Sequence, residues 1–386
     1  MTEPSPLRIG IDARTLSGHF TGDRTYWRGL IQGLAELDQT NQYFLYTRRP
    51  LDGIPPVLTP NFHWRTVGPS SHDAIWLLKH WPMALADDAI DVAHTQYNIP
   101  LLGAPCPVVT TIADITFALF PSLFLPKDRW ILNTCIPKSL TRAAAIITVS
   151  ESTRRDILRQ YKQLALAGKT HAILLAADTR YHVPTESRGD IAARVDQQYT
   201  LNGCRYILSV GVLQPRKNLI TLVDAFTLAR LGNRSLKHKL VVVGKRGWKN
   251  EAFDRHMATL PSDIRADIIF TGYVPDENLP DLYAAADIFC YPSIYEGFGL
   301  PPLEAMACGC PVICSNTSSL PEVVGDAGIL LPAKDSEAWA RAVEKLMGSA
   351  DIRSRWINRG LENAQRFSWK QTAEQTLSIY NNVRRT

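Results

Sequence analysis

Short apolar runs recur along the whole chain, and segments of helical length separate them. The predicted strands are residues 7–11, 43–46, 92–94, 108–112, 146–149, 172–175, 206–211, 240–244, 268–270, 288–291, 312–314 and 329–331. These runs show no alternation of polar and apolar residues, which is typical of strands buried on both faces of a parallel sheet. Because the intervening segments carry helical spacing, the sequence predicts an α/β fold.

The predicted strands fall into two series, and the 386-residue chain is long for a single hydrophobic core. We therefore expect two doubly wound domains, residues 1–185 and 205–366. Residues 186–204 are predicted to be a linker, because they are polar and carry little strand signal. Residues 367–386 show helical spacing and are predicted to close the fold as a C-terminal helix.

Composition excludes several classes of protein. A net charge of +5 is too mild to indicate nucleic-acid binding, and no nucleic-acid-binding motif is present. No run approaches the roughly 18 apolar residues that span a bilayer, and the N-terminus does not resemble a signal peptide. Cys308, Cys310 and Cys314 lack the paired spacing and the nearby histidine of a metal site, so we interpret them as small core residues. A reducing cytoplasm is the simplest predicted location.

Two carboxylates lie close together in residues 291–307. Glu296 and Glu304 have seven residues between them and flank a Gly-x-Gly turn. Pro301 and Pro302 then stand where a helix would begin, a position that suits proline. The start of a helix attracts phosphate and other anions. The pattern predicts a ligand site at the carboxyl end of a strand, where open α/β folds bind their ligands.

Two adjacent cations, Arg216 and Lys217, follow another predicted strand that ends near Gly211. A helix is expected to start around Asn218, a residue type that often caps helices. Guanidinium and ammonium groups side by side suit a diphosphate, which needs a bidentate grip and charge neutralisation. An Arg-Lys pair alone is more typical of a solvated turn. Its place after a buried strand, in the same domain as Glu296, favours the phosphate interpretation.

Three positions in the first half also follow predicted strands. Gly22 lies in a glycine-containing loop that would let the backbone approach a phosphate, although the spacing is not a dinucleotide fingerprint. Asp114 would either face the ligand site or cap a loop. His94 is either a hydrogen-bonded structural residue or a substrate contact.

These motifs together resemble the retaining glycosyltransferases of family 4. The matching positions are Gly211, Arg216-Lys217-Asn218, Gly272-Tyr273-Val274, residues 282–287, Pro292-Ser293 and residues 296–312. The resemblance covers almost the whole chain and is most specific in the second half. It implies a GT-B fold, in which two Rossmann-like domains face each other across a cleft. The C-terminal domain would hold a nucleotide sugar, and the N-terminal domain most of the acceptor site.

The resemblance also assigns roles to individual residues. Arg216 and Lys217 would clamp the diphosphate of the donor. Glu296 would contact the donor sugar, and Glu304 would bind the ribose hydroxyls. The implied catalytic residues are Arg216, Lys217, Glu296 and Asp114. The implied donor-binding residues are Gly22, Gly211, Val274, Glu296, Gly297, Phe298, Gly299, Leu300 and Glu304, with Val274 contacting the base through its backbone.

One position departs from the family pattern. Many relatives carry His-Asp where this chain has Ala113-Asp114, and in them the histidine lies near the donor sugar and the acceptor. Either the mechanism tolerates this loss, or the chain differs in activity or acceptor.

The resemblance implies transfer of a hexosyl group from a nucleoside diphosphate sugar with retention at the anomeric carbon. The leaving diphosphate would accept the acceptor proton, so that neither a metal nor another cofactor is expected. Segments such as residues 112–117 and 149–153 resemble mannosyltransferases of bacterial polysaccharide assembly, which favours GDP-mannose as donor. The acceptor would be a glycan or a lipid-linked sugar. Basic residues in the segment 127–162 suggest peripheral membrane contact, with a solvated helix face as the alternative.

Other functions stay open at this point. A sugar-nucleotide epimerase or a sugar phosphorylase could use the same fold. A non-catalytic homologue could retain the nucleotide-sugar pocket without the reaction, and Ala113 is the feature that supports it. A dinucleotide oxidoreductase is disfavoured by the absent fingerprint.

Overall fold

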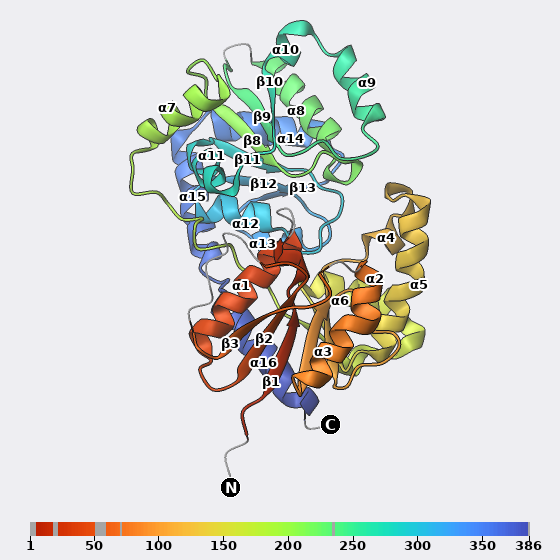
Figure 1. The fold of residues 1–386 in the computed structure, drawn as a ribbon. Coiled ribbons are helices and arrows are strands. Elements are labelled where there is room, and N and C mark those ends of the chain that lie inside the picture. The colour runs from red at the N-terminus through yellow and green to blue at the C-terminus, as the bar shows by residue number, and fades with distance from the viewer. Residues whose placement is uncertain (1–4, 18–21, 51–58, 70–71, 234–235, 385–386) are drawn as a thin grey trace. The chain divides into compact units, whose positions relative to one another are not determined.

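The computed structural model describes residues 5–17, 22–50, 59–69, 72–233 and 236–384. The chain forms two compact units, Met1–Ala176 with Ser368–Thr386, and Ala177–Phe367 (Figure 1). Every strand pair in both units is parallel, and helices connect the strands, so the predicted α/β class with two Rossmann-like domains is confirmed. Among the described residues, no helix has the length and apolar content needed to cross a membrane.

The first unit contains a seven-stranded sheet with the order β3-β2-β1-β4-β5-β6-β7. Its strands are β1 (Arg8–Asp12), β2 (Gln42–Thr47), β3 (Phe62–Thr66), β4 (Val92–Gln96), β5 (Val108–Ile112), β6 (Ala145–Thr148) and β7 (Thr170–Ala172). The sequence did not predict β3, because this edge strand is largely exposed and carries a polar pattern. The last strand lies at Thr170–Ala172 and overlaps the predicted 172–175 at one residue.

Helices surround this first sheet. They are α1 (Gly22–Leu37), α2 (Asp73–Ile75), α3 (Trp81–Asp87), α4 (Thr116–Leu119), α5 (Pro126–Arg142), α6 (Glu151–Gln160) and α16 (Trp369–Arg384). Short 3₁₀ turns lie at Arg14–Ser17, Pro121–Leu123, Lys162–Leu164 and Ala167–Lys169, and a π-helical turn lies at Trp76–His80.

The C-terminal helix α16 belongs to the first unit, although it follows the second in sequence. It packs against α1, where a Cβ on Gly29 would lie only 2.0 Å from the ring of Trp369. Its Tyr380 hydroxyl shares a 2.6 Å hydrogen bond with His94 Nδ1, and His94 Nε2 bonds Thr111 at 2.8 Å. Burial lowers the pKa of His94 to about 3. Of the two interpretations of His94, the structure therefore shows the hydrogen-bonded structural residue.

The second unit contains a six-stranded sheet with the order β10-β9-β8-β11-β12-β13. Its strands are β8 (Tyr206–Val210), β9 (Lys239–Val243), β10 (Ile268–Gly272), β11 (Ile288–Tyr291), β12 (Val312–Ser315) and β13 (Ile329–Leu331). All six predicted strands of this half are confirmed. The strand order reverses between β8 and β11, which is where ligands bind in folds of this kind.

Helices cover both faces of the second sheet (Figure 1). They are α7 (Arg188–Tyr199), α8 (Leu219–Gly232), α9 (Glu251–Thr259), α10 (Ser262–Ala266), α11 (Leu279–Ala285), α12 (Leu300–Ala307), α13 (Leu320–Val324), α14 (Ser336–Met347) and α15 (Ala350–Ala364). Leu208 of β8 joins a core cluster with α7, α11 and α12, whereas Ile207 joins a second cluster with α8 and α14. Successive strand residues thus point into two different cores, which explains the continuous apolar runs.

The segment predicted as a linker is helical. Residues 186–204 hold α7, which packs on α11 within the second unit, and the two units separate at Ala176. Only Ile191 and Val195 of α7 are buried, so the apolar signal was too sparse to indicate a helix.

Candidate functional site

Three of the predicted site residues of the second unit lie on loops that follow two neighbouring strands. Arg216 and Lys217 lie in a 3₁₀ turn (Pro215–Lys217) after β8, and Glu296 lies between β11 and α12. Because β8 and β11 are adjacent and parallel, their loops emerge at the same edge of the sheet. The backbone N–H of Ile294 donates to the carbonyl of Arg216 at 2.9 Å, which joins the two loops directly.

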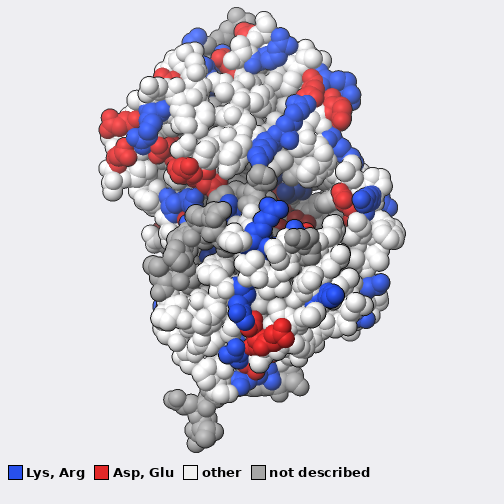
Figure 2. Space-filling view, in the orientation of Figure 1, with Lys and Arg blue, Asp and Glu red and all other residues white. Residues whose placement is uncertain are grey.

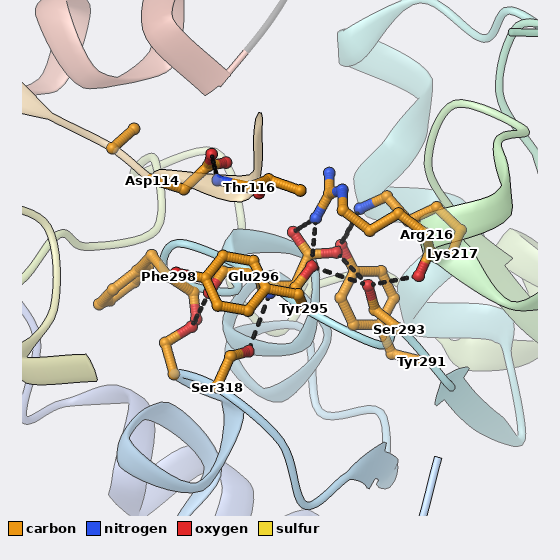
Figure 3. A network of polar contacts seen from close by, with 12 residues as sticks. Asp114, Thr116, Arg216, Lys217, Tyr291, Ser293, Tyr295, Glu296, Phe298 and Ser318 are labelled. Atoms are coloured by element: carbon orange, nitrogen blue, oxygen red, sulfur yellow. Dashed lines mark hydrogen bonds and ion pairs between the residues drawn. The ribbon is translucent and has the colours of Figure 1, made fainter. Parts of the chain in front are cut away.

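Glu296 forms ion pairs with both cations (Figure 3). Its Oε2 lies 2.6 Å from Arg216 Nη1, and its Oε1 lies 2.7 Å from Lys217 Nζ. Burial alone would raise the pKa of Glu296, but the charges of Arg216 and Lys217 lower it to about 2. Glu296 is therefore a carboxylate at neutral pH. Two cations against one carboxylate leave a net positive charge, which attracts an anionic ligand.

Neighbouring hydroxyl groups hold Glu296 in place. Ser293 Oγ donates to Glu296 Oε1 at 2.6 Å, and the Glu296 N–H donates to Ser318 Oγ at 2.8 Å (Figure 3). Lys217 Nζ also donates to the Tyr291 hydroxyl and lies over the Tyr291 ring. Ser293 belongs to the matching Pro292-Ser293 motif, but nothing in the sequence pointed to Ser318, which lies 22 residues beyond its partner.

Gly211 makes room for the cationic turn. Its φ of +151° favours glycine, and a Cβ there would lie 3.0 Å from Lys217 Cε. Asn218 is the residue directly before α8, where the helix was expected to start, but its side chain makes no capping hydrogen bond. It has a left-handed φ of +53°, and its amide donates to the carbonyl of Pro292 at 3.1 Å instead of capping. Asn218 thus helps to join the two loops.

Helix α12 begins at Leu300, as the paired prolines predicted. Gly299 precedes it with a φ of +119°, and Gly297 and Phe298 are buried. Ser319 Oγ donates to the carbonyls of Glu296 and Phe298, which fixes the Gly-x-Gly turn. Because Pro301 and Pro302 have no N–H, the donors at this helix start come from Leu300 and the turn before it.

Glu304 lies on α12 in a different environment from Glu296. Tyr283 of α11 donates its hydroxyl to Glu304 Oε2 at 2.9 Å. Burial raises the pKa of Glu304 to about 7, and the carboxylates of Asp276 and Asp178 add to this rise. Burial and these carboxylates therefore favour the protonated form of Glu304 up to near-neutral pH. The sequence indicated neither Tyr283 nor Asp276 as a neighbour of this carboxyl.

Val274 is buried and follows Gly272, which ends β10 with a φ of +69°. The backbone contact of Val274 with a base stays a prediction. The roles assigned to the other donor-binding residues likewise stay predictions.

The predicted residues of the first unit lie at the carboxyl edge of its own sheet. Gly22 is the first residue of α1, and the loop residues 18–21 before it lie outside the described part of the chain. Asp114 Oδ1 accepts a hydrogen bond from the Thr116 N–H at 2.8 Å (Figure 3). This contact is that of a residue that caps a loop, which was one of the two interpretations of Asp114. Asp23, which the sequence did not single out, lies near Asp114. Burial and the charge of Asp114 raise the pKa of Asp23 to about 6.

Two further predictions concern cysteines and metals. Cys308, Cys310 and Cys314 are buried, as expected of core residues. Within the described ranges, no group of three or more His, Cys, Asp or Glu side chains is placed to hold a metal ion. Metal independence stays a prediction.

Comparison with known proteins adds independent information. The model of the family "Glycosyl transferases group 1" matches residues 176–363. The O-antigen chain mannosyltransferase B of Escherichia coli is 38% identical over 275 residues, which cover 70% of this chain and 69% of that protein.

Solved structures show the same fold. The sucrose-phosphate synthase of Thermosynechococcus elongatus superposes with a TM-score of 0.75 at 22% identity, covering 98% of this chain and 99% of the other. Anabaena Alr3699/HepE, solved with UDP and glucose, has a TM-score of 0.71 at 18% identity, covering 97% of this chain and all of the other.

Proposed function

The chain belongs to the group 1 glycosyl transferases, and from this premise we propose that it transfers mannose from GDP-mannose to a glycan or lipid-linked acceptor. Glycosyl transfer follows from family membership. The choice of mannose rests on the 38% identical relative, which is named as a mannosyltransferase. The relative named as a mannosyltransferase gives no support to the epimerase, phosphorylase, oxidoreductase and non-catalytic alternatives.

The observation that carries the proposal is the ion-paired group of Arg216, Lys217 and Glu296. We infer that the donor diphosphate displaces Glu296 from part of this pairing and takes Arg216 and Lys217 as its own counter-ions. The Glu296 carboxylate then accepts hydrogen bonds from hydroxyls of the donor sugar. Such an exchange keeps every buried charge compensated, which a low-dielectric site requires.

The proposed reaction retains the anomeric configuration and uses no metal. The bond between the anomeric carbon and the diphosphate oxygen breaks, and the acceptor oxygen bonds to the same face of that carbon. The acceptor proton passes to the leaving diphosphate. Arg216 and Lys217 stabilise the negative charge that develops on the diphosphate, which is the task a divalent cation would otherwise perform.

Ala113 is compatible with this scheme. A leaving group that accepts the proton itself needs no histidine as general base. Asp114, which caps the turn at Thr116, is then proposed to orient the acceptor. The proposed location is the cytoplasm, with peripheral contact at the inner face of the membrane. The basic segment 127–162 supports that contact.

A panel of nucleotides and nucleotide sugars tests the donor. A ligand at a hundredfold over its Kd stabilises the folded protein by about 2.7 kcal/mol, which a thermal shift detects. We expect GDP and GDP-mannose to raise the Tm more than UDP and UDP-glucose do. A larger shift with UDP ligands would overturn the choice of GDP-mannose but leave glycosyl transfer intact.

Product analysis tests the reaction. Incubation with GDP-mannose and an acceptor, followed by NMR of the anomeric proton, should show an α-mannoside and free GDP. A β-linked product would contradict retention. An epimerised nucleotide sugar, or a sugar phosphate formed only with inorganic phosphate, would instead support the alternative enzymes.

A further inference from the structure

Helix α5 leaves one face unpacked in the first unit. Its Ile136 and Leu140 are buried in a core cluster shared with α6. The opposite side of the helix carries Lys127, Trp130, Ile131 and Lys138. The last three follow Lys127 by three, four and eleven residues, which are the spacings of residues on one helix face. We name these four residues the α5 face.

The α5 face exposes large apolar side chains. Trp130 is 70% exposed, more than any other tryptophan of the chain, and Ile131 is 39% exposed. Leu125, just before the helix, is 53% exposed. Single exposed apolar residues are ordinary on a protein surface, whereas here three lie within seven positions at the start of one helix.

The surrounding charge is strongly positive. Residues 125–163 contain eight Lys or Arg and three Asp or Glu, a net charge of +5 that equals the charge of the whole chain. Seven of these cations are exposed, whereas Asp128 is the one exposed acid within residues 125–163, all of which the structure describes. Figure 2 shows one face of the molecule, on which basic side chains lie beside acidic ones in several places.

Two kinds of partner could cover such a face, a protein or a membrane. A stable protein interface buries about 800 Å² on each side and excludes lysine from its core. Trp130 contributes at most about 250 Å², and Lys127 and Lys138 bracket the apolar pair. A bilayer surface fits better, because tryptophan favours the headgroup level and lysine can bury its stem while its ammonium meets lipid phosphate.

We propose that the α5 face binds a bilayer surface that contains anionic phospholipid. Trp130, Ile131 and Leu125 enter the headgroup region, and Lys127 and Lys138 contact lipid phosphates. The purpose of this binding rests on the proposed function, because the membrane would bring the enzyme to a lipid-linked acceptor. The binding itself is measurable without any transferase assay.

Vesicle flotation tests the proposal. The full chain is mixed at low salt with vesicles of phosphatidylglycerol and phosphatidylethanolamine, or with phosphatidylcholine alone. We expect flotation with the anionic vesicles and its loss toward 1 M salt, where the Debye length falls to about 3 Å. Absence of flotation at low salt, or equal flotation with neutral vesicles, overturns the proposal.

Variants separate the apolar and charged contributions. Trp130→Ser should weaken partitioning on the order of tenfold. Lys127→Gln with Lys138→Gln should weaken it about thirtyfold, because each cation near an anionic surface accounts for about fivefold. Matched controls in the second unit are Trp248→Ser, at a 41% exposed tryptophan, and Lys237→Gln with Lys345→Gln. Equal losses in the controls would show that the α5 face is not the site.

Two further measurements keep the outcomes distinct. Circular dichroism should give the same melting curve for Trp130→Ser and the wild type, since this side chain is mostly in solvent. Transfer to a water-soluble acceptor should be unchanged in Trp130→Ser. If the protein does not float with vesicles but still transfers mannose, the membrane proposal is wrong and the proposed function stands. If Trp130→Ser instead abolishes self-association in sedimentation, the occupant is a second copy of the chain and the proposal is overturned.

Discussion

Glu296 and Glu304 have the same side chain, are each 8% exposed and lie in one short segment, yet their pKa values shift in opposite directions. Glu296 meets two cations, and its pKa falls to about 2. Glu304 meets a tyrosine hydroxyl and further carboxylates, and burial raises its pKa to about 7. The comparison teaches that compensation by neighbouring charge, and not the degree of burial, decides whether a buried carboxyl is ionised.

The largest expected effect on activity comes from removing one of the two cations that pair with Glu296. Lys217→Ala should lower kcat/KM on the order of 10²–10³-fold, as expected for loss of one group that stabilises a developing anion. Steady-state kinetics with the donor measure this loss. The matched control Lys237→Ala removes an exposed lysine of the same unit and should leave the rate unchanged. Normal turnover in Lys217→Ala would refute the clamp.

Ionised Glu296 should also contribute to the free energy of unfolding. Its folded pKa of about 2 lies below the ordinary value of 4.5, so its contribution is present above pH 4.5 and is lost as the pH falls toward 2. The full shift corresponds to about 3 kcal/mol. Glu296→Gln should remove this contribution, because two cations are left without a counter-charge. Urea unfolding of the wild type and Glu296→Gln at pH 7 and near pH 2 measures it, and equal free energies of unfolding of the two proteins at pH 7 would contradict the ion pairs.

Glu304 should behave in the opposite way. Its folded pKa lies above the ordinary value, so the folded state binds the proton more tightly and stability falls as the pH rises from 4.5 toward 7. Glu304→Gln should flatten the pH dependence of Tm in this window.

The same variant tests the ribose assignment. If the Glu304 carboxylate binds the ribose hydroxyls, Glu304→Gln should raise the Kd of GDP by about tenfold, since hydrogen bonds to a charged group contribute about 1.5–3 kcal/mol. Wild-type affinity should increase as the pH rises through about 7, where the carboxylate forms. Calorimetric titration at several pH values measures both, and a pH-independent Kd in the wild type would argue against the assignment.

Tyr283→Phe should have a smaller effect. Without the 2.9 Å hydrogen bond from Tyr283, the Glu304 carboxylate loses a stabilising donor and its pKa rises further. If this hydrogen bond contributes about 1 kcal/mol, its loss lowers the ionised fraction of Glu304 at pH 7 about threefold, so GDP binding at pH 7 should weaken about threefold. The loss should shrink at pH 9, where Glu304 is ionised in both proteins.

The smallest expected effect is that of EDTA. If Arg216 and Lys217 neutralise the diphosphate, chelation should leave the transfer rate unchanged. Suppose instead that EDTA abolishes transfer and added Mg²⁺ or Mn²⁺ restores it. Arg216 and Lys217 would then not be sufficient to neutralise the diphosphate.

Prediction from the sequence succeeded where the signal was local. Buried strands appear as apolar runs, so all six strands of the second unit were found. Edge strand β3 and helix α7 were missed because each buries few side chains and carries little periodic signal. Gly211, Arg216 and Lys217 were found together because they follow one strand, and the Gly-x-Gly turn marked Glu296 in the same way.

Contacts between distant segments could not be read from the pattern. The pairing of Lys217 with Glu296 joins positions 79 residues apart, and Tyr283 lies 21 residues from Glu304. His94 finds Tyr380 across 286 residues. The sequence did not indicate Asp23, because the nearby carboxylate that raises its pKa, Asp114, follows a different strand.

The sequence by itself determined the fold class, the six strands of the second unit and the two carboxylates beside a helix start, since hydrophobic periodicity, glycine and proline act locally. Only the tertiary structure decided that Glu296 is ionised between two cations while the pKa of Glu304 is raised by burial. The physical reason is that desolvation and Coulomb interactions depend on distances through space, and folding sets those distances by bringing remote loops to one edge of a sheet.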